Sequence, residues 1–178
     1  MLVLFAIPIG LLAGSLLGGR LDGLSALRFR WPALVLGGLL VQVALFTPAG
    51  NAAAGAAAPA IYVGSTTAVF LAVLWNVRIP GMRAVAGGAL SNLAAIIANG
   101  GAMPADPAAL ATAGLTAGGY TNSVVLVNPA LRVLTDIFAV PSWVPLANVF
   151  SIGDVLIGIG IAITIVAAMR RPTVLPAA

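Results

Sequence analysis

The chain has 178 residues, of which 61% are hydrophobic and 7% are charged, with 8 Lys+Arg against 4 Asp+Glu. A soluble domain is ordinarily about 25% charged, so this composition predicts a protein whose solvent is lipid. The basic residues are all arginines. Because the charges are so few, we interpret the arginines as residues that set the orientation of the protein in a membrane, and not as a nucleic-acid-binding surface. Because the chain has no Cys and no His, it excludes disulfides, thiol nucleophiles and most zinc or haem sites. We expect no metal and no cofactor.

Five apolar segments follow one another along the chain, and each predicts a membrane-spanning helix. The spans are expected at about 2–19, 32–47, 60–77, 84–99 and 149–169, and they form a single transmembrane domain over 1–178. The first span is expected to be retained, since no positive stretch precedes it and no clean cleavage site follows it. Gly10, Gly14 and Gly18 line one face of this span, where another helix backbone can approach closely. Packing within the monomer is the default interpretation, and a dimer seam is the alternative.

Proline and glycine punctuate the connections between the first four spans. Pro32 suits the first turn of the second helix, where its missing N–H costs nothing. The Ala/Gly-rich stretch 48–59 predicts an exposed, flexible loop. Arg78–Arg83 predicts a tight basic turn. The fourth span is short, because a full crossing needs ~20 residues.

Residues 100–147 form the one long loop, which is expected to contain short helices. Asp106 and Pro107 have the residue types of an N-cap and a first helical position, and Gly114 would end that helix. Asn128-Pro129 repeats the signal.

The helix that would begin at Asn128-Pro129 would place Leu131, Leu134 and Ile137 on one side. Arg132 and Asp136 would then be spaced i,i+4, which suits an ion pair.

The distribution of arginines selects one orientation. With the N-terminus outside and the C-terminus in the cytoplasm, seven arginines face the cytoplasm and only Arg132 lies outside. Trp31 and Trp75 then lie at the cytoplasmic interface, and Tyr62 and Trp143 at the outer one. The sequence therefore predicts an all-α, five-span protein of the bacterial inner membrane, whose long loop is extracytoplasmic.

Polar side chains converge at the outer side of this arrangement. Asp154 lies about one turn into the last span, where a carboxylate costs roughly 2.5–3.5 kcal/mol at the midplane and less near an end. We therefore expect it to have a partner or a task. It could cap its own helix, pair with Arg132, or form part of a polar cup. The candidate ligand-binding residues are Asn92, Asn99, Arg132, Asp136, Asn148, Ser151 and Asp154.

Two segments resemble the active-site motifs of lipoprotein signal peptidase, a four-helix membrane aspartic peptidase. They are Gly88–Gly100 (GALSNLAAIIANG) and Val149–Gly160 (VFSIGDVLIGIG). The topology is also similar if the last four predicted spans correspond to the family's four helices. The resemblance implies that Asn92 takes the place of the family's motif Asn and Asp154 that of its second catalytic Asp.

The chain departs from that family at the first catalytic Asp. The corresponding residue is Ala95, and Ile96 replaces the following Arg. A dyad cannot share a proton when one member is a methyl group. The resemblance therefore implies a related fold without peptidase activity, unless Asp106 or Asp136 folds back to substitute.

The second half also resembles a family of small bacterial membrane proteins known only as a domain of unknown function. The likeness lies in Asn99–Pro104 (NGGAMP), Leu134–Phe138 (LTDIF) and Asn148–Gly160 (NVFSIGDVLIGIG). This resemblance implies no activity.

The sequence favours a non-catalytic membrane accessory or binding protein. It would hold a lipid-like or peptide segment, or a partner subunit's helix, against the Asp154 cup and the small-residue face of the first span. One alternative is an aspartic peptidase-like enzyme with Asp154 and Asp136 as its candidate catalytic pair. Another is an ion or solute carrier that uses Asp154. The expected partners are the lipid bilayer and a membrane subunit or membrane-anchored peptide, and not nucleic acid.

Overall fold

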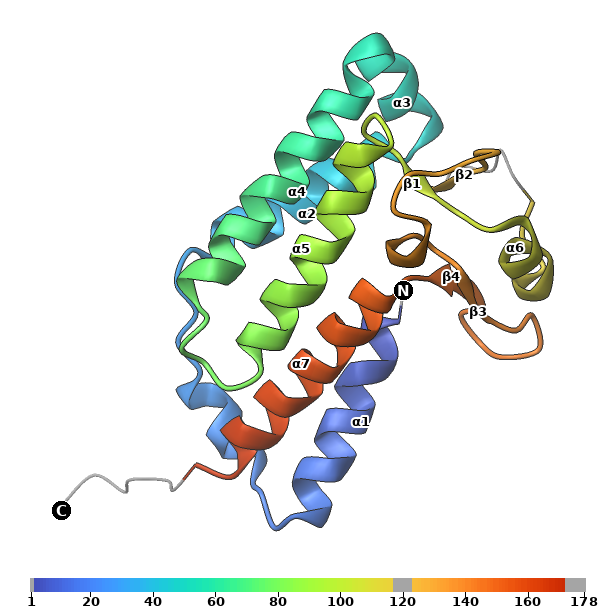
Figure 1. The fold of residues 1–178 in the computed structure, drawn as a ribbon. Coiled ribbons are helices and arrows are strands. Elements are labelled where there is room, and N and C mark those ends of the chain that lie inside the picture. The colour runs from blue at the N-terminus through green and yellow to red at the C-terminus, as the bar shows by residue number, and fades with distance from the viewer. Residues whose placement is uncertain (1, 117–122, 172–178) are drawn as a thin grey trace, which may run out of the picture.

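The computed structural model describes residues 2–116 and 123–171 and is mostly helical (Figure 1). The helices are α1 (Val3–Leu16), α2 (Pro32–Leu45), α3 (Pro48–Ala54), α4 (Ala58–Trp75), α5 (Met82–Ala98), α6 (Pro107–Ala113) and α7 (Ile152–Met169), with 3-10 turns at Leu21–Ala26, Gly55–Ala57 and Arg132–Leu134. The strands are β1 (Met103–Pro104), β2 (Ser123–Val124), β3 (Phe138–Val140) and β4 (Asn148–Phe150). The expected all-α class therefore needs a correction, because short strands occur in the long loop.

The five long helices form a row in the order α1, α7, α5, α4, α2. Figure 1 shows α7 between α1 and α5, and α4 between α5 and α2. The last helix of the chain thus lies inside the row, between α1 and α5, and α1 and α2 form the two ends. Each of these helices overlaps one of the five apolar segments expected from the sequence.

The glycine face of α1 packs inside the molecule. A Cβ added at Gly10 would lie 3.1 Å from the Cα of Ala162, and one at Gly14 would lie 2.5 Å from the sulfur of Met169. Gly18 follows the helix at φ +75° and meets nothing within 4 Å. Packing within the monomer is therefore confirmed for Gly10 and Gly14. Because α7 covers this face, the expectation that it receives a partner is wrong.

The stretch 48–59 is helical, so the predicted flexible loop is wrong. Thr47 caps α3, since its hydroxyl accepts a hydrogen bond from the Gly50 N–H at 3.0 Å, and Pro48 occupies the first helical position. Alanine has the highest helix propensity, and here it outweighs the glycines. Pro32 begins α2 as expected.

A compact unit, here called the cap, comprises the described residues 100–116 and 123–151. It lies beside the Asn99 end of α5 and next to the N-terminal end of α7 (Figure 1). Within the described residues, β1 pairs with β2 in parallel and β3 pairs with β4 antiparallel. Helix α6 packs on β3 and β4 around a small apolar cluster of Ala105, Ala109, Leu110, Ala113 and Val149.

The start of α6 agrees with its sequence signals. The Asp106 side chain accepts from the Ala108 N–H, Pro107 takes the first turn, and Gly114 ends the helix at φ +70°. The second short helix expected in the loop does not form. Only the 3-10 turn Arg132–Leu134 is present, because the Asp136 backbone then pairs with the β1 segment.

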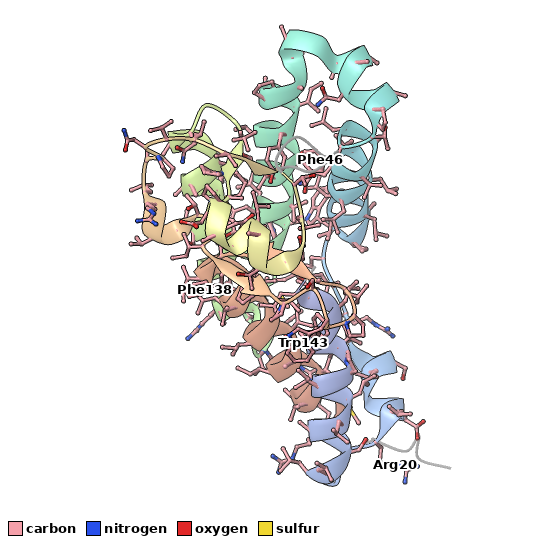
Figure 2. The ribbon with its side chains drawn as sticks, turned by 90° about the vertical axis from the view of Figure 1, so that its right-hand side faces the viewer. Arg20, Phe46, Phe138 and Trp143 are labelled. Atoms are coloured by element: carbon pink, nitrogen blue, oxygen red, sulfur yellow. The ribbon has the colours of Figure 1, made fainter. Side chains whose placement is uncertain are left out.

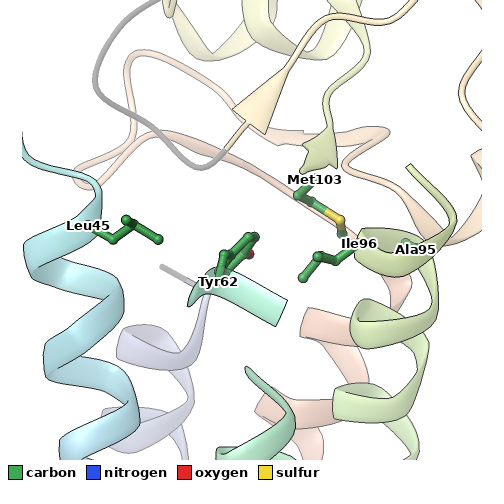
Figure 3. Packing of buried hydrophobic residues seen from close by; sticks show 5 residues of the cluster. All are labelled: Leu45, Tyr62, Ala95, Ile96 and Met103. Atoms are coloured by element: carbon green, nitrogen blue, oxygen red, sulfur yellow. The ribbon is translucent and has the colours of Figure 1, made fainter. Parts of the chain in front are cut away.

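A buried apolar cluster joins α2, α4, α5 and the start of the cap (Figure 3). Its members are Leu45, Tyr62, Ala95, Ile96 and Met103. The Phe46 ring meets the Tyr62 ring edge-on, with centroids 5.0 Å apart. This cluster fixes the Asn99 end of α5 against α4.

Two helical stretches among the described residues are long and apolar enough to cross a membrane, Pro48–Trp75 and Ile152–Met169. The apolar helices α1, α2 and α5 are shorter, at 14, 14 and 17 residues. Large apolar side chains point outward from the row, with Leu40 on α2 67% exposed. Figure 2 shows such side chains along the outer faces of the helices.

Candidate functional site

Asp154 forms a capping box with the residue that precedes α7. The Ser151 hydroxyl accepts from the Asp154 N–H at 3.1 Å, and the Asp154 Oδ2 accepts from the Ser151 N–H at 3.0 Å. Such reciprocal bonds satisfy two backbone donors that a helix start leaves free. The positive end of the helix dipole also favours the carboxylate there. The local-capping interpretation of Asp154 is therefore confirmed.

Asn92 on α5 closes these bonds into a ring across two helices. Its Nδ2 donates to the Asp154 Oδ1 at 2.9 Å, and its Oδ1 accepts from the Ser151 hydroxyl at 2.8 Å. Ser151 is fully buried, and Asn92 and Asp154 are half-buried. We call this ring the Asn92–Ser151–Asp154 network. It links the two motifs through Asn92 and Asp154, which are 62 positions apart in the chain.

Glycines allow α5 and α7 to approach closely enough for the network to form. A Cβ on Gly153 would lie 2.0 Å from the Asn92 Oδ1, and a Cβ on Gly88 would lie 2.3 Å from the Gly153 carbonyl oxygen. Real Cβ atoms do not tolerate such separations, so both positions require glycine while the helices keep this distance. The GALSN segment of α5 and the SIGD segment at the start of α7 therefore form the two sides of one helix–helix contact.

Both carboxylate oxygens of Asp154 are already hydrogen-bonded. Arg132, the other partner considered for Asp154, instead forms an ion pair with Asp106 at 2.9 Å. The Asp154 group is therefore arranged to join two helices. It lines neither of the two hollows described below.

The Arg132–Asp106 pair lies on the cap surface. The hydrogen bond from Arg132, and then the one from the Ala108 N–H, lowers the pKa of the Asp106 carboxyl below its ordinary value. The expected i,i+4 pair of Arg132 with Asp136 is not formed, because the helix that would carry it is absent. The carboxylate partner comes instead from the start of α6.

Asp136 is buried within the cap. Its backbone N–H donates to the Pro104 carbonyl at 3.0 Å, and its carbonyl accepts from the Asp106 N–H at 2.9 Å. These bonds attach the loop to β1. They give the backbone of this segment the hydrogen-bond partners that the predicted helix would otherwise have supplied.

Two hollows of ≈570 and ≈490 Å³ flank the Arg132–Asp106 pair. Both are lined by Asp106, Arg132 and Ile137. The first continues along α6 and β3, and the second along the segment that follows β2. Neither is lined by Asn92, Ser151 or Asp154, so both hollows lie on the cap, away from the Asn92–Ser151–Asp154 network.

The remaining candidates, Asn99 and Asn148, do not join the network. The Asn99 side chain donates to the Ala130 carbonyl and accepts from the Ala130 N–H, both at 2.9 Å, and so clips the cap to the end of α5. Asn148 lies on β4 opposite Val140. Asn99 therefore holds the cap against α5, whereas Asn148 lies in the hairpin of the cap itself.

Ala95, which stands where the signal peptidase pattern has its first catalytic Asp, is 0% exposed within the apolar cluster of Figure 3. Its neighbours there include Tyr62 and Met103. The chain thus replaces a carboxylate position by core packing.

The profile of a family of unknown function, DUF5317, matches residues 26–166, which is most of the chain. The chain belongs to the DUF5317 family. No curated protein and no solved structure matches the sequence. The matched range contains the cap, the network and helices α2 to α5, so the site described here lies within the part shared with DUF5317. The likeness to an uncharacterised family is thereby confirmed, and the likeness to lipoprotein signal peptidase stays a hypothesis.

Proposed function

We propose that this DUF5317 chain is a non-catalytic protein of the bacterial inner membrane that crosses the bilayer five times. The N-terminus and the cap lie on the extracytoplasmic side, and the C-terminus lies in the cytoplasm. The cap receives a lipid-like or peptide segment, or part of a partner subunit, at the hollows beside Arg132.

Support for embedding comes from the outward faces of the row. Leu36, Leu40 and Val43 on α2 and Leu12 and Leu16 on α1 are all exposed. In water such surfaces would aggregate, whereas in lipid they cost nothing. Since α1, α2 and α5 are shorter than ~20 residues, their crossings include flanking turns or a locally thinner bilayer.

The single observation that carries the non-catalytic assignment is the closed Asn92–Ser151–Asp154 network. An aspartic peptidase needs two carboxyl groups that share a proton around one water. Asp154 uses both oxygens in hydrogen bonds, and the motif position for its dyad partner is the buried Ala95. A carrier would need this carboxylate free to exchange its partners, and the same closure argues against it.

Support for binding at the cap comes from the composition of the two hollows. Their walls are mostly apolar, with Val133, Ile137 and Phe138 among the lining residues, and a single ion pair stands between them. Pockets that combine apolar walls with a few polar groups suit ligands of mixed character. A lipid-like or peptide segment has that character.

The topology can be tested by cysteine labelling, because the chain has no Cys of its own. Val127→Cys on the cap and Ser25→Cys in the turn after α1 are both at exposed positions. With a membrane-impermeant maleimide on intact spheroplasts, we expect labelling of the first variant only, and of both after lysis. Labelling of Ser25→Cys in intact spheroplasts, with protection of Val127→Cys, would overturn the proposal.

Binding at the cap can be tested with a photo-crosslinking amino acid. At Val133, which is exposed and lines the first hollow, we expect a discrete adduct of a lipid-like or peptide mass. At Leu36 on α2 we expect only bulk phospholipid. If Val133 gives no adduct, or the same phospholipid pattern as Leu36, the hollows are not a binding site.

A further inference from the structure

The hairpin of β3 and β4 ends in an uncharged apolar turn. Phe138 pairs with Phe150 across the hairpin, and their rings stack with centroids 5.6 Å apart. The turn between the strands, Pro141–Ala147 (PSWVPLA), is here called the hairpin tip. Between Asp136 and Asp154 the sequence has no charged residue.

Two large apolar side chains of the hairpin tip are exposed. Trp143 is 83% exposed and Leu146 is 49% exposed. Leu146 has φ +63°, a left-handed conformation that costs a bulky residue energy. A turn that accepts this cost in order to keep an apolar side chain outward indicates a surface that receives it.

Backbone hydrogen bonds also hold the hairpin tip in place. The Val144 N–H donates to the Pro141 carbonyl at 2.9 Å, and the Ala147 N–H donates to the Val144 carbonyl at 3.1 Å. The Ser142 N–H donates to the Thr112 carbonyl of α6 at 3.1 Å. Because these backbone groups already have partners, the turn can leave water at little cost.

The base of the hairpin is fixed beside the N-terminal end of α7. Strand β4 ends at Phe150, and α7 begins at Ile152. Figure 1 shows the hairpin projecting sideways from the N-terminal ends of α1 and α7, and Figure 2 shows Trp143 at about the level of these helix ends. In the proposed topology this is the level at which α7 leaves the bilayer.

We propose that the hairpin tip inserts Trp143 and Leu146 into the outer interface of the lipid bilayer and so holds the cap down on the membrane. This inference rests on the proposed function, which supplies the bilayer. Tryptophan favours the headgroup level, where its ring has an apolar body and a polar N–H. The tip has no charged side chain that would oppose its entry into this layer.

A lipid surface is favoured over a second copy of the chain. Two exposed large side chains on a convex turn offer far less area than the ~800 Å² per partner of a stable protein interface. They are also uncharged, so nothing there selects a partner's orientation.

The test uses Trp143 as the sole tryptophan, in a Trp31→Phe, Trp75→Phe background reconstituted in vesicles. These changes keep an aromatic pair at the tilted Trp31–Trp75 contact. With lipids brominated near the headgroup, we expect strong quenching of Trp143 and weak quenching by aqueous acrylamide. The matched control moves the tryptophan to a water-facing cap position by Trp143→Phe with Ala111→Trp, since Ala111 is exposed on α6 and lines neither hollow. It should show the opposite pattern.

Equal behaviour of the two tryptophans, with full acrylamide quenching, would overturn the inference. Protection of Trp143 from both quenchers, varying with the protein-to-lipid ratio, would assign the hairpin tip to a second copy and overturn it too. A second measurement leaves all three tryptophans in place: a spin label at Leu146→Cys reports whether the hairpin tip contacts lipid or water, and we expect lipid. A label at Ile163→Cys on the outward face of α7 separates the two proposals. If it too contacts water, the proposed function fails; if it contacts lipid while the tip does not, only this inference fails.

Discussion

Two adjacent glycines of α5 should respond oppositely to alanine. Gly88 faces α7, where an added Cβ would lie 2.3 Å from the Gly153 carbonyl oxygen and 2.8 Å from the Ile157 Cγ1. Ordinary contact begins near 3.4 Å, so Gly88→Ala forces the helices apart by about an ångström. Overpacking of this kind costs roughly 1–3 kcal/mol. Weakening the charged hydrogen bond between Asn92 and Asp154 costs roughly a further 1–2 kcal/mol.

Gly87 is the matched control, because nothing lies within 4 Å of a Cβ added there. In a helix, alanine at such a position is favoured over glycine by roughly 0.5–1 kcal/mol. We therefore expect the free energies of unfolding of Gly88→Ala and Gly87→Ala to differ by about 2.5–6 kcal/mol. The assay is SDS-induced unfolding in mixed micelles, followed by circular dichroism. Equal stability of the two variants would refute the close contact of α5 with α7.

Three further predictions concern the cap and the motif position on α5. Arg132→Gln should remove a stabilising effect that is present in the wild type above pH 3.8, the ordinary pKa of aspartate, and is lost as the pH falls through the lowered pKa of Asp106. The midpoint temperature of thermal unfolding, measured above and below that pH, should therefore fall less steeply with decreasing pH in the variant than in the wild type. Equal slopes would contradict a stabilising Arg132–Asp106 pair. Ala95→Asp, which places a carboxylate where the signal peptidase pattern has its first catalytic Asp, should misfold, since a buried unpaired charge costs several kcal/mol. A folded variant that cleaves a lipopeptide would show instead that a peptidase site survives. Asn99→Ala should speed amide exchange around Ala130 severalfold by removing two hydrogen bonds, with exchange in α7 unchanged; equal exchange at Ala130 would mean that the clip is not needed.

Local signals in the sequence predicted several features of the fold well. Pro32 and the Asp106–Gly114 helix depend on caps and proline geometry, which act within a few residues. The capping box of Ser151 with Asp154 has the same local character. Such interactions can be predicted because the residues that make them are neighbours in the chain.

Interactions between distant residues could not be predicted in the same way. Arg132 pairs with Asp106, 26 positions away, because a bridge between Ala105 and Asp136 replaces the expected helix. The sequence did place Asn92 near Asp154, but the closure of their network depends on Gly153 allowing contact. Periodicity gives the face of a helix, whereas the distance between two helices emerges only from packing.

The coupling between Asn92 and Asp154 is the most direct test of whether this carboxylate joins two helices. The measurement is a double-mutant cycle of Asn92→Ala and Asp154→Ala on the free energy of unfolding in mixed micelles. For a charged hydrogen bond at 2.9 Å we predict a coupling energy of roughly 1–3 kcal/mol, so that the double variant loses clearly less than the sum of the two single losses. Strictly additive losses would mean that the two side chains act independently, and Asp154 would then need another role.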